Sequence, residues 1–299
     1  MTTELAATPA PIRIGPATFA WGQRTFVMGI LNVTLDSFSG DGLLTAAART
    51  DPVARAVAQA RQMIAEGADL LDIGGESTRP GHEPVDAATE IERIVPVIAA
   101  VAAALPNTPI SVDTTKPAVA EAALAAGAHL LNDVWGGRAD GGMMAAVAAA
   151  QRVPLILMHN RSEPRYERAV AAEVLTDLTR AVERAIAAGV PEVDLIVDPG
   201  IGFGKTADHN VELLRDLRQL RALGRPVLLG TSRKSTLGRI LDLPADQRLE
   251  ATLATTALGI AAGVDIVRVH DVQPNVRAAR VADAIIRGHW RADLSGATP

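Results

Sequence analysis

Residues 110–133 read ISVDTTKPAVAEAALAAGAHLLND and contain one complete strand–helix–strand pattern. Two short apolar runs, which stop at Asp113 and Asn132, enclose an alanine-rich stretch over 117–126 that is followed by Gly127. Proline at the start and glycine just past the end are typical of an α-helix. Apolar runs without polar alternation are typical of parallel strands that are buried on both faces. The stretch therefore predicts a β–α–β unit.

The same alternation continues in both directions, and eight apolar runs in all stop on polar residues. These polar ends are Asn32, Asp72, Asp113, Asn132 with Asp133, His159, Asp198, Ser232 to Lys234, and Arg268 with His270. The stretches between them predict helices over 52–66, 86–104, 117–126, 141–151, 169–188, 208–223 and 248–262. Eight units predict an α/β fold, a (β/α)₈ TIM barrel, in which all strands end at one mouth. Turns favour Asp and Asn, but that preference does not explain Arg, Lys and His at the same places.

The N-terminal part is expected to close the other end of the barrel. Residues 1–11 resemble a flexible tail, and 12–299 are expected to form a single barrel domain. Two alternating segments, Ile12–Ile14 and Ala17–Trp21, flank a Gly15-Pro16 turn and predict a β-hairpin at the barrel floor.

Composition and charge exclude several classes of protein. The chain has 299 residues, 48% of them hydrophobic and 21% charged, which suits one large core. A net charge of −5 and a pI of about 5.7 argue against a nucleic-acid partner. The absence of cysteine excludes disulfides and cysteine metal sites and agrees with a reducing compartment. No apolar run reaches the roughly 18 residues of a membrane span, and no signal-peptide pattern opens the chain, so a cytoplasmic location is expected.

Two loops at the predicted mouth have the composition of ligand-binding segments. The first, over 32–42, is rich in Gly, Ser and Asp and cannot contribute to a core. The second, over 74–81, contains three glycines that let the backbone approach a ligand closely. Thr78 and Arg79 in this loop offer a hydroxyl group and a cation for an anion.

Seven ordered motifs resemble those of the dihydropteroate synthase family. They are MGILNVT-DSFS, DIGGESTRPG, SVDT-KP, LND, DPGIGFGK, TSRKS and RVHDV, and they extend from about Val27 to Val272. The resemblance implies a transferase of folate biosynthesis that joins 6-hydroxymethyl-7,8-dihydropterin diphosphate to 4-aminobenzoate and releases diphosphate. It also implies a homodimer, Mg²⁺ as cofactor and a sulfonamide target. The first loop departs from the family pattern, since Leu35 replaces the usual proline and GDG replaces DGG.

The resemblance assigns the pterin to four residues. A reduced pterin presents an edge of amino, ring N–H and carbonyl groups, which carboxylates and carboxamides can meet with hydrogen bonds. By resemblance, Asp113, Asn132 and Asp198 bind this edge, and the Lys234 ammonium donates to the ring. A plain strand cap is the alternative for Asp198.

The diphosphate is assigned to residues from three strand ends. Arg268 and His270 lie two residues apart, so their side chains point to the same face of the last strand. Arg268 needs an anion there, which leaves open either a phosphate or a buried carboxylate. By resemblance, these two residues bind the diphosphate with Thr78 and Asn32. The carboxamide oxygen of Asn32 is also the expected protein ligand of Mg²⁺, which the diphosphate would hold too.

The 4-aminobenzoate is assigned to loops and a helix start. Ser235 and neighbouring N–H groups begin the helix after TSRKS, where a carboxylate is favoured. Phe203 offers a ring face, and Arg79 and Pro80 are expected to close the other side. A core aromatic is the alternative for Phe203.

The expected catalytic residues are Asp113, Asp198, Lys234, Arg268 and His270. Ionisation of the pterin methylene would give a cation that the ring delocalises, so no covalent nucleophile is required. Stabilisation of the departing diphosphate and alignment of the aniline nitrogen would be the main tasks.

Other roles and functions stay open. Asp72 and Asp133 are expected to be structural, and Lys205 is expected to be solvated or structural. His159 is either a satisfied strand-end histidine or a functional one. A pterin-dependent methyltransferase would not require TSRKS or GESTRPG, and a silent pterin-binding paralogue would not require the diphosphate residues.

Overall fold

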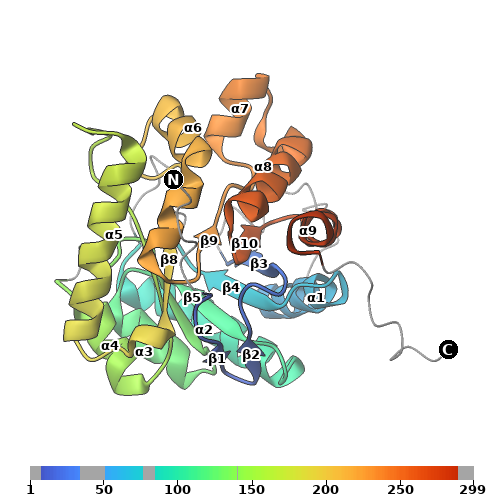
Figure 1. The fold of residues 1–299 in the computed structure, drawn as a ribbon. Coiled ribbons are helices and arrows are strands. Elements are labelled where there is room, and N and C mark those ends of the chain that lie inside the picture. Colours follow the sequence, from blue (N-terminus) through green and yellow to red (C-terminus); the bar gives the residue numbers. More distant parts are fainter. Residues whose placement is uncertain (1–7, 34–50, 77–84, 140, 289–299) are drawn as a thin grey trace.

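The computed structural model describes residues 8–33, 51–76, 85–139 and 141–288 (Figure 1). The strands are β1 (Ile12–Ile14), β2 (Ala17–Phe19), β3 (Phe26–Asn32), β4 (Leu70–Gly74), β5 (Ile110–Asp113), β6 (Leu130–Asp133), β7 (Leu155–Met158), β8 (Leu195–Asp198), β9 (Leu228–Leu229) and β10 (Ile266–Val269). The α-helices are α1 (Pro52–Ala65), α2 (Ala87–Ala104), α3 (Pro117–Ala125), α4 (Met143–Gln151), α5 (Val170–Ala187), α6 (Ala207–Arg215), α7 (Ser235–Leu241), α8 (Leu249–Ala262) and α9 (Val272–Arg287). Short 3₁₀ helices cover Glu192–Asp194, Leu217–Leu223 and Ala245–Gln247.

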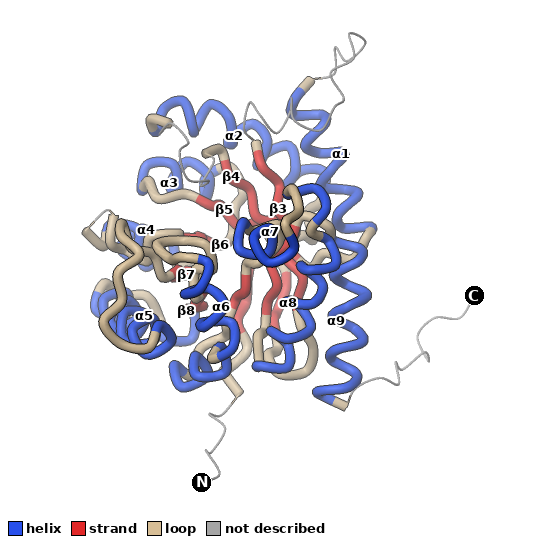
Figure 2. The backbone as a smooth tube through the Cα atoms, turned by 90° about the horizontal axis from the view of Figure 1, so that it is seen from above, coloured by secondary structure: helices blue, strands red, loops and turns tan. Residues whose placement is uncertain are grey.

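Eight parallel strands form the barrel within the described residues. Their order is β8-β7-β6-β5-β4-β3-β10-β9, and a parallel bridge between Val197 and Val227 joins the two ends of this order. Helices surround the strands when the molecule is viewed from above (Figure 2). The predicted (β/α)₈ barrel is therefore confirmed.

Alternation along each strand divides the core into two layers. Side chains such as Val27 and Leu71 point outward and pack against the helices. Their neighbours Phe26 and Leu70 point inward and pack with the hairpin residues at one end of the barrel. This two-residue period explains why almost every strand position is apolar.

The N-terminal hairpin closes the barrel at the amino ends of the strands, as expected. Strands β1 and β2 pair antiparallel, and Ile12 and Ile14 are completely buried against the inner layer. The ring centroid of Phe26 lies 4.7 Å from that of Phe19 and 5.4 Å from that of Trp21. Since these aromatic side chains fill the floor, only the carboxyl ends of the strands remain for a binding site.

Most predicted helices agree with the structure to within two residues, and the range 208–223 is the exception. In place of one helix, α6 ends at Arg215 and a 3₁₀ helix follows over Leu217–Leu223. Leu217 and Leu220 are both buried, and three residues per turn place them on one side. Helix α9 was not predicted from the sequence, although its buried Val272, Val276 and Ala279 follow a helical spacing.

No helix in the described part of the chain is both long enough and apolar enough to cross a lipid bilayer.

Candidate active site

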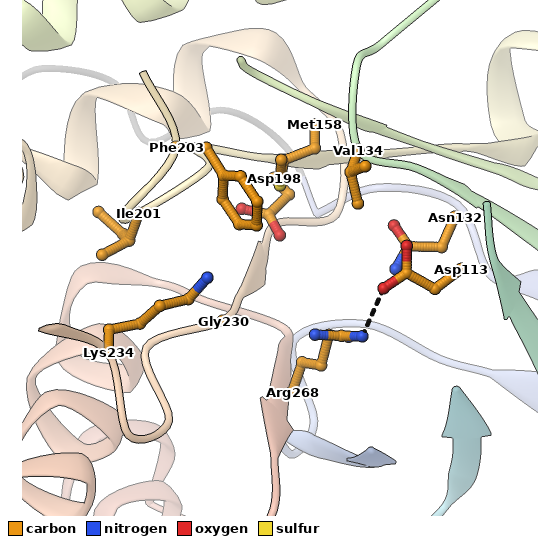
Figure 3. Close-up of a pocket in the computed structure, with 10 residues that line it drawn as sticks. All are labelled: Asp113, Asn132, Val134, Met158, Asp198, Ile201, Phe203, Gly230, Lys234 and Arg268. Carbon is orange, nitrogen blue, oxygen red and sulfur yellow. Dashed lines mark hydrogen bonds and ion pairs between the residues drawn. The ribbon is translucent and has the colours of Figure 1, made fainter. Parts of the chain in front are cut away.

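A pocket lies where the carboxyl ends of the strands meet. It encloses about 320 Å³ of space, part of it open to solvent, and is lined by Asp113, Asn132, Val134, Met158, Asp198, Ile201, Phe203, Gly230, Lys234 and Arg268. Asp113, Asn132 and Arg268 lie on one side, while Ile201, Phe203 and Lys234 lie on the other (Figure 3). The fold thus brings together six of the residues that the sequence analysis singled out, from β5, β6, β8, β10 and two loops.

Arg268 is held between two carboxylates. Its Nε donates to Asp72 Oδ2 at 2.5 Å, and its Nη2 donates to Asp113 Oδ2 at 2.7 Å. Asn132 Nδ2 donates to the same Asp72 oxygen at 3.0 Å. Of the two partners left open for Arg268, the structure therefore shows the buried carboxylates. Asp72 is completely buried and supports both Arg268 and Asn132, which agrees with its expected structural role.

Both pocket carboxylates are costly to ionise. Burial raises the pKa of Asp113 to about 7, although the Arg268 charge draws it down. Burial also raises the pKa of Asp198 to about 6, against the hydrogen bond that Gly200 N donates to Asp198 Oδ1. Among the described residues, Asp113 Oδ1 has no hydrogen-bond partner. A buried acceptor of this kind at a pocket wall is suited to a ligand that donates a hydrogen bond.

Lys234 lies against an aromatic ring on the opposite wall. Its Nζ is 3.9 Å from the centroid of the Phe203 ring, a cation–π contact. Burial, reinforced by the Arg268 charge, lowers the pKa of Lys234 to about 8. Phe203 therefore lines the pocket, as a substrate-contacting residue would, and is not a core aromatic.

Lys205 and His159 form a buried chain of hydrogen bonds behind this wall. Lys205 Nζ contacts His159 Nδ1 at 2.9 Å and donates to Gly200 O at 2.9 Å and to Phe203 O at 3.0 Å. His159 Nε2 lies 3.2 Å from Asp177 Oδ2, so the neutral ring donates there and accepts from Lys205. Burial lowers the pKa of His159 to about 4, which keeps the ring neutral. Lys205 is thus a half-buried residue with a structural role, and His159 is a satisfied histidine.

Asn32, His270 and Ser235 lie at the mouth of the barrel, but they are not among the residues that line the described pocket. Asn32 is the last residue of β3 and pairs in register with Gly74 of β4. His270 follows β10, and its Nδ1 lies 3.0 Å from Ser232 Oγ. Ser235 is the exposed first residue of α7.

Several assignments fall outside the described residues. They are Thr78, Arg79 and Pro80 of the second loop, and Leu35, the departure from the family pattern in the first loop, lies outside them too. The side chain of Asp133 accepts from Trp135 N at 2.9 Å and from Gly137 N, which agrees with the structural role expected of this residue.

Asn210 is a buried residue of α6 that forms hydrogen bonds to two segments of the pocket and was not predicted from the sequence. Its helix was predicted, and a carboxamide on the apolar face of a helix was the available signal. The partners of that carboxamide depend on tertiary packing and could not be read from the sequence.

A metal ion at this mouth would have to be held mainly by the substrate and by water, because the protein offers few ligands. No group of three or more His, Cys, Asp or Glu side chains that could hold a metal occurs among the residues placed by the structure. Asn32 offers one half-buried carboxamide at the end of β3. This donor set fits Mg²⁺, which commonly keeps its waters and binds phosphate oxygens with few protein ligands.

Comparisons with known proteins agree on one family. A family model described as "Pterin binding enzyme" matches residues 28–270. A dihydropteroate synthase of Clostridium beijerinckii is 47% identical over 92% of this chain and 100% of its own. A solved dihydropteroate synthase of Xanthomonas albilineans with 4-aminobenzoic acid gives a TM-score of 0.85 at 39% identity, covering 93% of this chain and 98% of that one. Another from that organism, in complex with 7,8-dihydropteroate, gives 0.82 at 38% identity, covering 92% and 98%.

Proposed function

This chain belongs to the dihydropteroate synthases of the pterin-binding enzyme family, and from that membership we propose how its residues share the work of the reaction. It is a transferase of folate biosynthesis that joins 6-hydroxymethyl-7,8-dihydropterin diphosphate to 4-aminobenzoate and releases diphosphate. The convergence of Asp113, Asn132, Asp198 and Lys234 on one pocket is the observation that carries the proposal.

The pterin edge is proposed to bind between Asp113, Asn132 and Asp198. Asp113 Oδ1 is buried and free to accept from the ring or its amino group. Asp198 adds a second carboxylate, while the Asn132 carboxamide can both donate and accept. Lys234 approaches from the opposite wall, where its ammonium can donate to the ring carbonyl. Asp113, Asn132 and Asp198 are buried from water, which strengthens each of these contacts.

The diphosphate is proposed to lie toward Asn32 and His270, at the outer part of the mouth, with Thr78 as a further donor. Arg268 lies between the pterin part and the diphosphate part of the substrate, because its guanidinium donates a hydrogen bond to Asp113 and can also face the leaving group. Asn32 would hold Mg²⁺ through its carboxamide oxygen. When bound, the ion would neutralise charge that develops on the departing diphosphate.

The 4-aminobenzoate is proposed to bind at the Phe203 wall, with its carboxylate near Ser235 and the start of α7. Phe203 provides a ring face for the benzoate, and Arg79 and Pro80 are proposed to complete this side. The catalytic work is then electrostatic: Asp113 and Asp198 favour the positive pterin, Arg268 and His270 favour the departing anion, and Lys234 orients the ring.

A coupled assay for 7,8-dihydropteroate tests the proposal. The wild-type chain should form product from the two substrates only when Mg²⁺ is present, and Lys234→Met should reduce the rate by at least about 100-fold. A methyltransferase or a silent pterin-binding paralogue would bind the pterin and yield no dihydropteroate. Full activity after removal of divalent ions by a chelator would contradict the assignment of Mg²⁺.

We also propose a homodimer through the outer face of α8 and α9. Leu258, Val281 and Ile285 are 71%, 61% and 75% exposed, which is unusual for large apolar side chains that stay in water. Val281 and Ile285 are four residues apart and share one face of α9.

Replacing both α9 residues should separate the subunits. We expect Val281→Glu/Ile285→Glu to halve the mass measured by light scattering, since two charges on this face oppose apolar association. The control is Ile240→Glu, at a 61% exposed position of α7, which should keep the wild-type mass. A wild-type protein that is monomeric at micromolar concentration would contradict the dimer.

A single domain over 12–299 and a cytoplasmic location complete the proposal, while most of the tail expected over 1–11 lies outside the described residues. The pterin-binding family model matches most of this domain, and the absence of cysteine suits a reducing compartment.

A further inference from the structure

Asn210 of α6 forms three hydrogen bonds although it does not line the pocket. Its side chain is buried, with 2% of the residue exposed. Its Oδ1 accepts from Gly202 N at 2.8 Å, while its Nδ2 donates to Thr206 O and to Thr236 Oγ1, both at 2.9 Å. The orientation of the carboxamide is unambiguous, because Gly202 N–H can only donate and the Thr206 carbonyl can only accept.

Two of the hydrogen-bond partners of Asn210, Gly202 and Thr236, belong to two different segments of one pocket wall. Gly202 lies between Ile201 and Phe203, which both line the pocket. Thr236 lies in the first turn of α7, two residues after Lys234. A single buried carboxamide therefore joins the segment that carries the aromatic ring to the segment that carries the ammonium group.

These two segments also touch each other directly. A Cβ atom at Gly202 would lie 3.1 Å from Lys234 Cδ, tighter than an ordinary contact, and φ at Gly202 is +84°. The Lys234 ammonium rests 3.9 Å from the Phe203 ring centroid. The position of Lys234 over the ring thus depends on how closely the segment around Gly202 is held to α7.

We propose that Asn210 is a positioning residue that sets the distance between the pterin side of the pocket, at Lys234, and the 4-aminobenzoate side, at Phe203. This inference rests on the proposed roles of those two residues. The reaction requires the amine nitrogen to face the pterin methylene at close range, and an error of about 1 Å can cost on the order of 100-fold in rate. Asn210 limits that error through the Thr236 hydroxyl group.

The hydrogen bond to Thr206 O lies within α6 and gives Asn210 a structural role as well, so the test acts on Thr236. Thr236→Val keeps the shape of the side chain and removes the hydroxyl group that Asn210 Nδ2 meets. Thr236→Ser keeps the hydroxyl group and removes only the methyl group. Asn210 and Thr236 are both buried, so substitutions there can also destabilise the fold. The unfolding temperatures of Thr236→Val and Thr236→Ser are therefore measured together with their kinetics.

We expect Thr236→Val to lower kcat by about 10-fold or more, with a higher KM for 4-aminobenzoate, since both substrates bind but are poorly aligned. Thr236→Ser should stay within about threefold of the wild-type kcat. Asn210→Asp keeps the acceptor for Gly202 N but loses the donors to both Thr236 Oγ1 and Thr206 O, so its kcat should fall at least as far as that of Thr236→Val. Adding Thr236→Val to Asn210→Asp should lower kcat little further, because the link to Thr236 is already broken.

Two outcomes separate this inference from the proposed site. If Lys234→Met keeps full synthase activity, the proposed site is wrong and the positioning role falls with it. If Lys234→Met loses activity while Thr236→Val and Thr236→Ser have equal kcat and KM values, the site stands and the role of Asn210 is only structural. The inference would also be overturned if the loss of activity in Thr236→Val and Thr236→Ser were proportional to the fall in unfolding temperature, since the hydroxyl group would then have no role of its own.

Discussion

The Asp113→Asn variant should bind a dihydropterin about 100-fold more weakly than the wild type, while its fold is retained. Asp113 Oδ2 accepts from Arg268 at 2.7 Å, which leaves the buried Oδ1 to accept from the ring. The variant has only one acceptor oxygen, so its NH₂ group must face either the guanidinium or a donor of the ring. Loss of a charged hydrogen bond together with an unsatisfied buried donor costs about 3 kcal/mol or more. Calorimetric titration with a dihydropterin measures the effect.

The pH dependence of the same titration gives a second measurement. With a pKa of about 7 in the free protein, Asp113 is mostly protonated at pH 6 and must lose its proton to accept from the ring. Wild-type affinity should therefore fall as the pH decreases below 7, and Asp113→Asn should remove most of this dependence.

A matched control is available at the barrel floor. Asp283 is also a buried carboxylate that pairs with an arginine, since its Oδ1 accepts from Arg287 Nε at 2.7 Å. Asp283→Asn should lower the unfolding temperature and leave pterin affinity unchanged. Wild-type affinity in Asp113→Asn, or an equal loss in both variants, would remove Asp113 from the pterin site.

The Arg268→Met variant should lose both stability and activity, more than any other single change in the pocket. The methionine side chain has a similar length but leaves Asp72 and Asp113 without their shared cation. Removal of one partner from a buried ion pair typically costs about 3–5 kcal/mol. The unfolding temperature and the synthase rate are the two measurements.

The stability loss in Arg268→Met should depend on pH in a defined direction. The folded pKa of Asp113 is already raised to about 7, against about 3.9 in an unfolded chain, so its contribution to stability is lost as the pH rises between these values. The Arg268 charge lowers this pKa, so its removal moves the folded pKa upward. The deficit of the variant should be largest above pH 7 and smaller near pH 5. A deficit that is constant from pH 5 to pH 8 would contradict the role of the ion pairs.

The His270→Ala variant separates the leaving group from the pterin. His270 is not one of the residues that line the described pocket, and its Nδ1 lies 3.0 Å from Ser232 Oγ, so its loss should weaken binding of the diphosphate form and spare a pterin without that group. Arg268→Met should weaken both ligands, because its partner Asp113 serves the pterin. Equal loss of both ligands in His270→Ala would place this histidine in the pterin pocket.

The strands and the approximate place of the site could be predicted because both depend on local patterns. Short apolar runs marked the strands, and their polar ends marked the mouth where Asp113, Asn132 and Asp198 meet. The partners of Arg268 could not be chosen from the sequence. An inward arginine needs an anion in any case, and only the stagger of β4, β5 and β10 brings two carboxylates within its reach.

Residues that act from behind the pocket were harder to predict. Lys205 follows a glycine-rich loop, a context that is equally typical of a solvated lysine. Two of its partners, Gly200 and Phe203, lie in that loop, and the third, His159, directly follows β7. Asn210 has partners from its own helix, a loop and a different helix. Periodicity indicates which face of α6 is buried, but the segments that cover that face follow from tertiary packing.

The pairing of β10 with β3 has a consequence for synthesis of the chain on the ribosome. The first and last barrel strands are neighbours, with Arg268 in register with Met28. Asp72 and Asp113 therefore leave the ribosome well before the cation that pairs with them, and the sheet keeps an open edge until β10 arrives. One strand thus completes both the barrel and the charge balance of its active site. A nascent chain that stops before β10 therefore has neither a closed barrel nor the arginine that pairs with Asp72 and Asp113.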